Sequence, residues 1–103
     1  MATSRSKIIR DGLVGRIPAD QIRTVASRQE HLDALAAKLT EERNELAAAA
    51  YADPEEFADI LQVLIDLASI AGVSWDAIED ARKTKLSGRG GFVGGHIYTP
   101  PPE

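Results

Sequence analysis

Residues 32–71 read LDALAAKLTEERNELAAAAYADPEEFADILQVLIDLASIA, and this stretch predicts two helices joined by a short turn. Its first half carries leucines at the spacing of one helix face, namely Leu32, Leu35, Leu39 and Leu46. Asp53 then offers an N-cap and Pro54 a first helical position for a second helix, which Gly72 should end. We therefore expect helices over about 27–50 and 54–71 that fold back on each other as a hairpin.

A basic arm, a third helix and a tail flank this hairpin. The arm comprises residues 1–26; residues 1–17 mix glycine, arginine and isoleucine and are expected to be extended rather than helical, and Pro18 marks the end of that stretch. Ser74 can cap a third helix in which acids come first and bases last, ending near Gly88. We expect one helical domain over 27–92, followed by a glycine- and proline-rich tail, 93–103, with at most one short strand.

The composition excludes several classes of function. A chain of 103 residues fits one domain, and the lack of cysteine excludes disulfides, thiolate metal sites and thiol nucleophiles. No long uncharged apolar run is present, and charged residues follow the start too closely for a signal peptide. We therefore expect a cytoplasmic protein that does not enter a membrane.

Charge is segregated along the chain, although the total is only −4. The net charge is +4 over residues 1–28, −11 over 29–80 and +3 over 81–103. An acidic centre concentrates a divalent cation and basic ends receive phosphate, so a metal-bound nucleotide would use both. On composition alone, a solvated acidic helix pair with basic ends explains the pattern as well. Nucleic-acid binding is not expected, because no aromatic residues interleave the basic ones.

One acid lies inside the leucine stripe of the first helix. At about 100° per residue, Glu42 shares the sector of the leucines, Glu45 lies at its edge and Glu41 points away. An ionised carboxylate on a core-facing surface is costly unless a metal or a cation compensates it. Lys38, four residues earlier, is the ordinary compensator, and a metal ion is the alternative.

The second helix carries a matching pair of acids. Glu56 and Asp59 lie one turn apart near its start, so an antiparallel hairpin would bring them opposite Glu42 and Glu45. Ligation by carboxylate oxygens alone favours Mg²⁺ or Mn²⁺ over zinc or copper. Taken singly, Glu56 could be a capping acid and Glu45 a surface ion-pair partner.

The second helix is also apolar on two faces and needs neighbours on two sides, which predicts self-association.

The acids form a recognisable pattern, E-E-x-x-E followed by E-x-x-D, in Glu41-Glu42-Arg43-Asn44-Glu45 and Glu56-Phe57-Ala58-Asp59. The pattern resembles that of the MazG-like all-α nucleotide pyrophosphatases, a superfamily that includes phosphoribosyl-ATP pyrophosphohydrolase and dimeric dUTPase. Residues 85–92, KLSGRGGF, resemble the K-x-x-x-R-G-G-F ending of its small phage and bacterial members. The resemblance covers roughly residues 30–92.

This resemblance implies an all-α fold in which the hairpin and a third helix form a four-helix-bundle-type core in a dimer or tetramer. It implies Mg²⁺-dependent hydrolysis of a nucleoside or deoxynucleoside triphosphate to the monophosphate and pyrophosphate, of the house-cleaning type. The implied metal ligands are Glu42, Glu45, Glu56 and Asp59, with Glu45 best placed to activate water. The candidates for phosphate binding are Lys38, Lys83, Lys85 and Arg89. The alternatives are a non-catalytic helical interaction module and a phosphoribosyl-nucleotide pyrophosphohydrolase.

Overall fold

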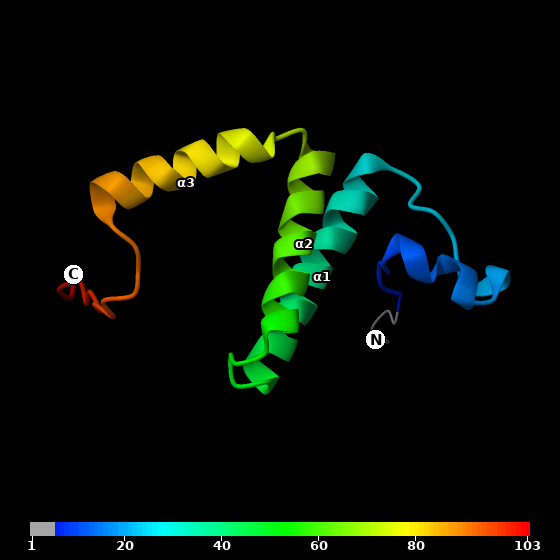
Figure 1. Ribbon diagram of the computed structural model, residues 1–103, viewed down its shortest axis with the longest axis horizontal. Coiled ribbons are helices and arrows are strands. Elements are labelled where there is room, and N and C mark those ends of the chain that lie inside the picture. Colours follow the sequence, from blue (N-terminus) through cyan, green and yellow to red (C-terminus); the bar gives the residue numbers. More distant parts are fainter. Residues whose placement is uncertain (1–5) are drawn as a thin grey trace. The chain divides into compact units, whose positions relative to one another are not determined.

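The computed structural model describes residues 6–103, and that part of the chain contains helices and no strands (Figure 1). The elements are the 3-10 helices η1 (Asp11–Arg16) and η2 (Ala19–Gln21) and the α-helices α1 (Arg28–Ala48), α2 (Pro54–Ala71) and α3 (Trp75–Arg89). The chain divides into two units, Met1–Val73 and Ser74–Glu103, which are described separately. The all-helical prediction is thereby confirmed.

The ends of α1 and α2 fall within two residues of the predicted ones because the capping residues act as expected. The Ser27 hydroxyl accepts a hydrogen bond from the Glu30 backbone N–H over 3.0 Å. The Asp53 carboxylate accepts one from the Glu55 N–H over 2.9 Å, with Pro54 as the first helical residue. Each cap satisfies a backbone donor that has no partner within its helix.

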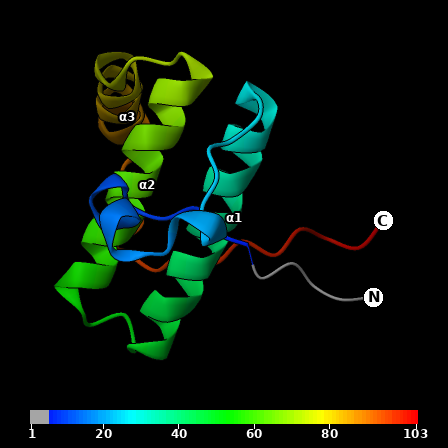
Figure 2. The same ribbon diagram turned by 90° about the vertical axis from the view of Figure 1, so that its right-hand side faces the viewer.

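The helices α1 and α2 lie side by side and run in opposite directions (Figures 1 and 2). Among the described residues, the buried apolar side chains are Leu35 and Leu46 of α1 and Val63 of α2. Away from the turn, the Arg28 guanidinium donates to the carbonyls of Ile70 and Ala71, over 3.2 and 3.1 Å. A cation at the last carbonyls of α2 also suits the helix dipole, so this contact fastens the open end of the hairpin.

Both helices of the hairpin end in the same hydrogen-bonded turn, the Schellman motif. At the end of α1, the Tyr51 N–H donates to the Leu46 carbonyl over 2.9 Å, and Ala50 has a φ of +56°. At the end of α2, the Val73 N–H donates to the Ala68 carbonyl over 2.9 Å, and the equivalent left-handed position is Gly72, with a φ of +80°. The tight hairpin turn therefore holds an alanine where the motif favours glycine.

This difference predicts opposite effects for two matched substitutions. Ala50→Gly should raise the free energy of unfolding by about 1 kcal/mol, because an L-residue in the left-handed region costs roughly that amount. Gly72→Ala should lower it by a similar amount for the same reason. Urea unfolding followed by circular dichroism measures both, and two changes of the same sign would contradict the explanation.

The N-terminal arm is not extended throughout, which corrects the prediction for residues 1–17; residues 1–5 lie outside the described part. It forms η1 and η2, in which bonds such as Leu13 N–H to the Arg10 carbonyl (3.0 Å) close single tight turns. Such turns need few residues, so the glycines do not prevent them. The arm reaches the hairpin through the ion pairs of Lys7 with Glu41 and of Arg10 with Asp59. The Arg23 guanidinium holds Glu30 at 2.7 Å and, by this hydrogen bond, lowers the pKa of Glu30 to about 2.

The second unit consists of α3 and the tail. Ser74 caps α3 through the Ala77 N–H over 3.1 Å, and Gly90 follows the helix with a φ of +75°. The short strand considered for the tail does not form, because residues 90–103 find no strand partner within the described chain.

Across residues 6–103 no helix alone is long and apolar enough to span a membrane, and only α2 and α3 taken as a bent pair pass that test.

Candidate active site

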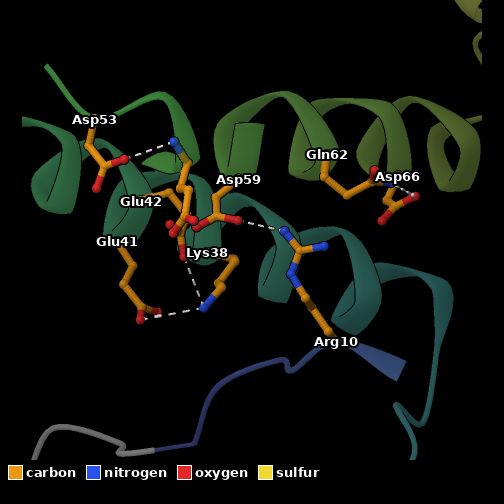
Figure 3. Close-up of polar contacts among 9 residues, drawn as sticks. Arg10, Lys38, Glu41, Glu42, Asp53, Asp59, Gln62 and Asp66 are labelled. Atoms are coloured by element: carbon orange, nitrogen blue, oxygen red, sulfur yellow. Dashed lines mark hydrogen bonds and ion pairs between the residues drawn. The ribbon is translucent and has the colours of Figure 1, made fainter. Parts of the chain in front are cut away.

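Five carboxylates gather on the turn half of the hairpin and form what is called here the acidic cluster: Glu41, Glu42, Glu45, Glu56 and Asp59. Ligand oxygens of Glu41, Glu42 and Glu45 lie within 4.8 Å of one another, and so do those of Glu42, Glu56 and Asp59. Glu42 belongs to both groups, and Figure 3 shows its side chain pointing toward Asp59 across the two helices. The antiparallel hairpin thus joins acids from α1 and α2.

Glu42 is the most buried member of the acidic cluster. Its residue is only 4% exposed, and it lies in the same face of α1 as the buried Leu35 and Leu46. Lys38 holds its Oε1 atom at 3.1 Å. Its Oε2 atom is buried and accepts no hydrogen bond from any described residue, and the same is true of Glu56 Oε2. Two buried carboxylate oxygens without a donor from the chain need another partner, such as a cation or a water molecule.

The spacing of these oxygens fits a small divalent ion. Mg²⁺ binds oxygen at about 2.1 Å, so opposite ligands lie about 4.2 Å apart. Oxygens of Glu42, Glu56 and Asp59 within 4.8 Å of one another need little movement to meet that geometry. Burial and the neighbouring charges, Glu45 first and then Glu42, raise the pKa of Glu56 above its usual value. The acidic cluster is therefore short of positive charge.

Three cations partly neutralise the acidic cluster, and two of them come from the arm. The Arg10 guanidinium donates to Asp59 Oδ1 over 2.6 Å, and the Lys7 ammonium lies 3.3 Å from Glu41 Oε1. Lys38 lies 3.5 Å from the same Glu41 oxygen (Figure 3). Desolvation alone would raise the pKa of Glu41, but the pairs with Lys7 and Lys38 lower it below the usual value.

Sequence reasoning missed the contacts that Arg10 and Lys7 make with the acidic cluster. Glu41, which the helical period places outside the leucine stripe, forms an ion pair with Lys7 of the arm over 3.3 Å, and one of its oxygens lies within 4.8 Å of oxygens of Glu42 and Glu45. A helical wheel considers α1 alone, so every residue outside the apolar stripe is assumed to face solvent. The signal available in the sequence was the charge of +4 over residues 1–28 opposite −11 over 29–80.

A half-open cavity of about 900 Å³ lies between the arm and the hairpin and reaches the acidic cluster. The arm contributes residues 7–13 to its wall, including Ile8 and Ile9. Apolar residues of both helices, such as Leu35 and Val63, continue the wall, and Lys38, Glu42 and Asp59 stand together in it. The cavity is large enough for a nucleotide-sized ligand with a charged group beside the acids.

The structure brings some of the proposed site residues together and leaves others apart. Lys38 pairs with Glu41 and Glu42 rather than with Glu45, which is exposed. Glu56 and Asp59 are half-buried next to Glu42. The remaining candidates for phosphate binding lie on α3 in the second unit, and all three are exposed: Lys83, Lys85 and Arg89.

Comparison with known proteins gives one match. A family model described as dATP/dGTP pyrophosphohydrolase matches residues 20–89. No curated protein and no solved structure matches the chain. The matched segment contains α1, α2 and α3, and with them every member of the acidic cluster.

Proposed function

Because the chain belongs to the dATP/dGTP pyrophosphohydrolase family, we propose that it hydrolyses dATP or dGTP to the monophosphate and pyrophosphate at the acidic cluster. Membership makes it a nucleotide pyrophosphohydrolase, a hydrolase of phosphoanhydride bonds, consistent with the MazG-like superfamily. The proposal goes further in naming the purine deoxynucleotides, the acidic cluster and Mg²⁺. In the reaction, water adds to phosphorus and the bond between the α- and β-phosphates breaks, releasing pyrophosphate.

The observation that carries the proposal is the pair of buried oxygens without donors, Glu42 Oε2 and Glu56 Oε2. Stability alone does not account for them, because an apolar residue at position 42 would continue the leucine stripe at no desolvation cost. Oxygen ligands favour Mg²⁺, with Mn²⁺ as a substitute. When bound, the metal would polarise the phosphate oxygens and lower the pKa of a coordinated water.

The chain's own residues divide the remaining work. Glu42, Glu56 and Asp59 hold the metal, and Glu45 joins the ligand set from the group that Glu42 shares with Glu41. Glu45 is exposed, so we assign it also the task of orienting and deprotonating the attacking water. Lys38 binds phosphate beside the metal. The phosphate-binding role of Lys83, Lys85 and Arg89, which belong to the second unit, stays a prediction from the sequence.

Self-association is part of the proposal. One face of α2 is apolar and open to solvent within the first unit: Phe57 is 52% exposed, Leu61 49% and Leu64 38%. We propose that a second copy of the chain covers this face in a four-helix arrangement. Light scattering on the purified protein should therefore give at least twice the mass of one chain, and a monomer at assay concentrations would contradict it.

A cellular role follows from the activity. Removal of particular deoxynucleoside triphosphates as monophosphates is a house-cleaning function, and we place it in the cytoplasm, where nucleotides and Mg²⁺ are available. The phosphoribosyl-nucleotide alternative is disfavoured, because the matched family is described by deoxynucleotides.

A substrate panel tests the proposed reaction. The four deoxynucleoside triphosphates and ATP are incubated with the protein and Mg²⁺, and the products are separated by ion-exchange chromatography. We expect pyrophosphate and a monophosphate, formed at least about tenfold faster from dATP or dGTP than from the pyrimidine nucleotides. Release of a diphosphate and inorganic phosphate would contradict the reaction, and no turnover with any nucleotide would contradict the function.

A further inference from the structure

The arm places a guanidinium directly on an acid that the metal needs. The Arg10–Asp59 contact of 2.6 Å joins residues that are 49 apart in the sequence, and it lies in the wall of the cavity. Lys7 repeats the arrangement on Glu41 at 3.3 Å. Two cations of one short segment therefore rest on two carboxylates of the acidic cluster.

We propose that Arg10, assisted by Lys7, binds the triphosphate of the nucleotide, and that its pair with Asp59 is its resting position before metal and nucleotide arrive. The inference rests on the proposed function. It makes the arm part of the substrate site, a role that the family match, which begins at residue 20, does not cover.

Charge makes Arg10 and a metal ion compete for Asp59. A divalent ion ligated by Asp59 would lie within a few ångströms of a guanidinium donating to the same carboxylate, and like charges at that separation repel. The acidic cluster has five acids, and only Arg10, Lys7 and Lys38 neutralise them. It can therefore bind one divalent cation while some of these basic residues stay paired with the other acids. When the metal takes Asp59, Arg10 needs a new anion, and the triphosphate brings one.

The position of Arg10 suits this transfer. Its side chain is 59% exposed, as is that of Lys7, so neither is held by packing. Both residues and Lys38 line the cavity beside Glu42 and Asp59, where the phosphates of a metal-bound nucleotide would lie. The planar fork of a guanidinium matches two phosphate oxygens, whereas an ammonium acts as a point charge.

A purely structural ion pair would behave differently. A pair with exposures of 59% and 35% contributes little to stability, so loss of Arg10 should leave folding almost unchanged. Its loss should also free Asp59 for the metal. The proposal therefore predicts that loss of Arg10 changes the two affinities differently. Compared with the unsubstituted protein, the variant should bind the metal alone equally or more tightly and the nucleotide more weakly.

Calorimetric titration of the full-length protein tests this directly. The variants are Arg10→Gln, Arg10→Lys and Arg16→Gln; Arg16 is an exposed arm residue outside the cavity wall and serves as the matched control. The probes are Mg²⁺ alone, and Mg²⁺ with the α,β-imido analogue of dATP or dGTP, which resists cleavage. For Arg10→Gln we expect analogue binding about ten- to a hundredfold weaker, with Mg²⁺ binding unchanged or tighter. Arg10→Lys should be intermediate and Arg16→Gln unchanged.

Each contrary outcome has a distinct meaning. Equal analogue binding by Arg10→Gln and the unsubstituted protein overturns the role of Arg10 and leaves the proposed function standing. Parallel loss of Mg²⁺ and analogue binding, or a lower melting temperature, identifies a structural ion pair and also overturns it. If the unsubstituted protein binds no analogue with Mg²⁺, the proposed function fails and this inference fails with it.

Discussion

Replacement of Glu42 by Gln is expected to lower the rate of pyrophosphate release by at least about a hundredfold. Glu42 is shared by both groups of ligand oxygens, so its loss weakens every metal position that the acidic cluster can offer. A metal ion contributes several kcal/mol of charge stabilisation in phosphoryl transfer, and each 1.4 kcal/mol corresponds to about tenfold in rate. The measurement is kcat/KM for the preferred deoxynucleotide at saturating Mg²⁺.

The same variant should not be less stable in the absence of metal. Glu42 is 4% exposed and glutamine keeps its shape; the amide oxygen can still accept from Lys38, which also keeps its ion pair with Glu41, so the melting temperature without Mg²⁺ should change little. Glu55→Gln is the matched control, since Glu55 is an exposed acid of α2 outside the acidic cluster. Retained turnover in Glu42→Gln, or loss in Glu55→Gln, would refute the assigned site.

Withdrawal of the divalent ion should abolish turnover and also lower the melting temperature. Protein in excess chelator should release no pyrophosphate, and added Mg²⁺ or Mn²⁺ should restore activity. Binding to the folded state alone adds about 2.7 kcal/mol of stability at a hundred times the dissociation constant, which shifts the melting temperature of a small domain by on the order of 10 °C. Differential scanning fluorimetry over a Mg²⁺ series measures this shift.

Two variants locate the binding responsible for the shift. Glu56→Gln and Asp59→Asn should flatten the dependence of the melting temperature on Mg²⁺, because each removes a ligand of the group around Glu42. Glu55→Gln should keep it. The metal-binding role of the acids would be refuted if the melting temperature of the unsubstituted protein did not depend on Mg²⁺ and the protein stayed active in excess chelator.

Local rules in the sequence were sufficient for the hairpin. Ser27 and Asp53 cap the two helices through bonds to their own first turns, and Gly72 ends α2 in a left-handed conformation. Glu42 stood out because it interrupts a stripe of leucines, and its burial between Leu35 and Leu46 follows from that same period. These features depend on residues only a few positions apart, so they can be predicted from the periodic pattern of the sequence.

Contacts with the arm could not be found in this way. The pairs Lys7–Glu41 and Arg10–Asp59 span 34 and 49 residues, and nothing in the helical period of α1 or α2 encodes which distant cation meets which acid. The turns η1 and η2 that place Arg10 also lack an apolar period and carry glycines, so composition favoured an extended arm. The opposite net charges of residues 1–28 and 29–80 favour contact between the arm and the hairpin, but they do not determine which residues meet.

The acidic cluster is drawn from one hairpin, residues 41–59, and this has a kinetic consequence. Contacts this close in sequence form early, so the folding chain meets the repulsion among its acids in the transition state rather than after it. Relief of that repulsion, by Mg²⁺ or by neutral substitutions at Glu56, should then speed refolding more than it slows unfolding. Stopped-flow refolding with and without Mg²⁺ should show a higher refolding rate constant with Mg²⁺. A change confined to the unfolding rate constant would mean that α1 and α2 pair only after the transition state.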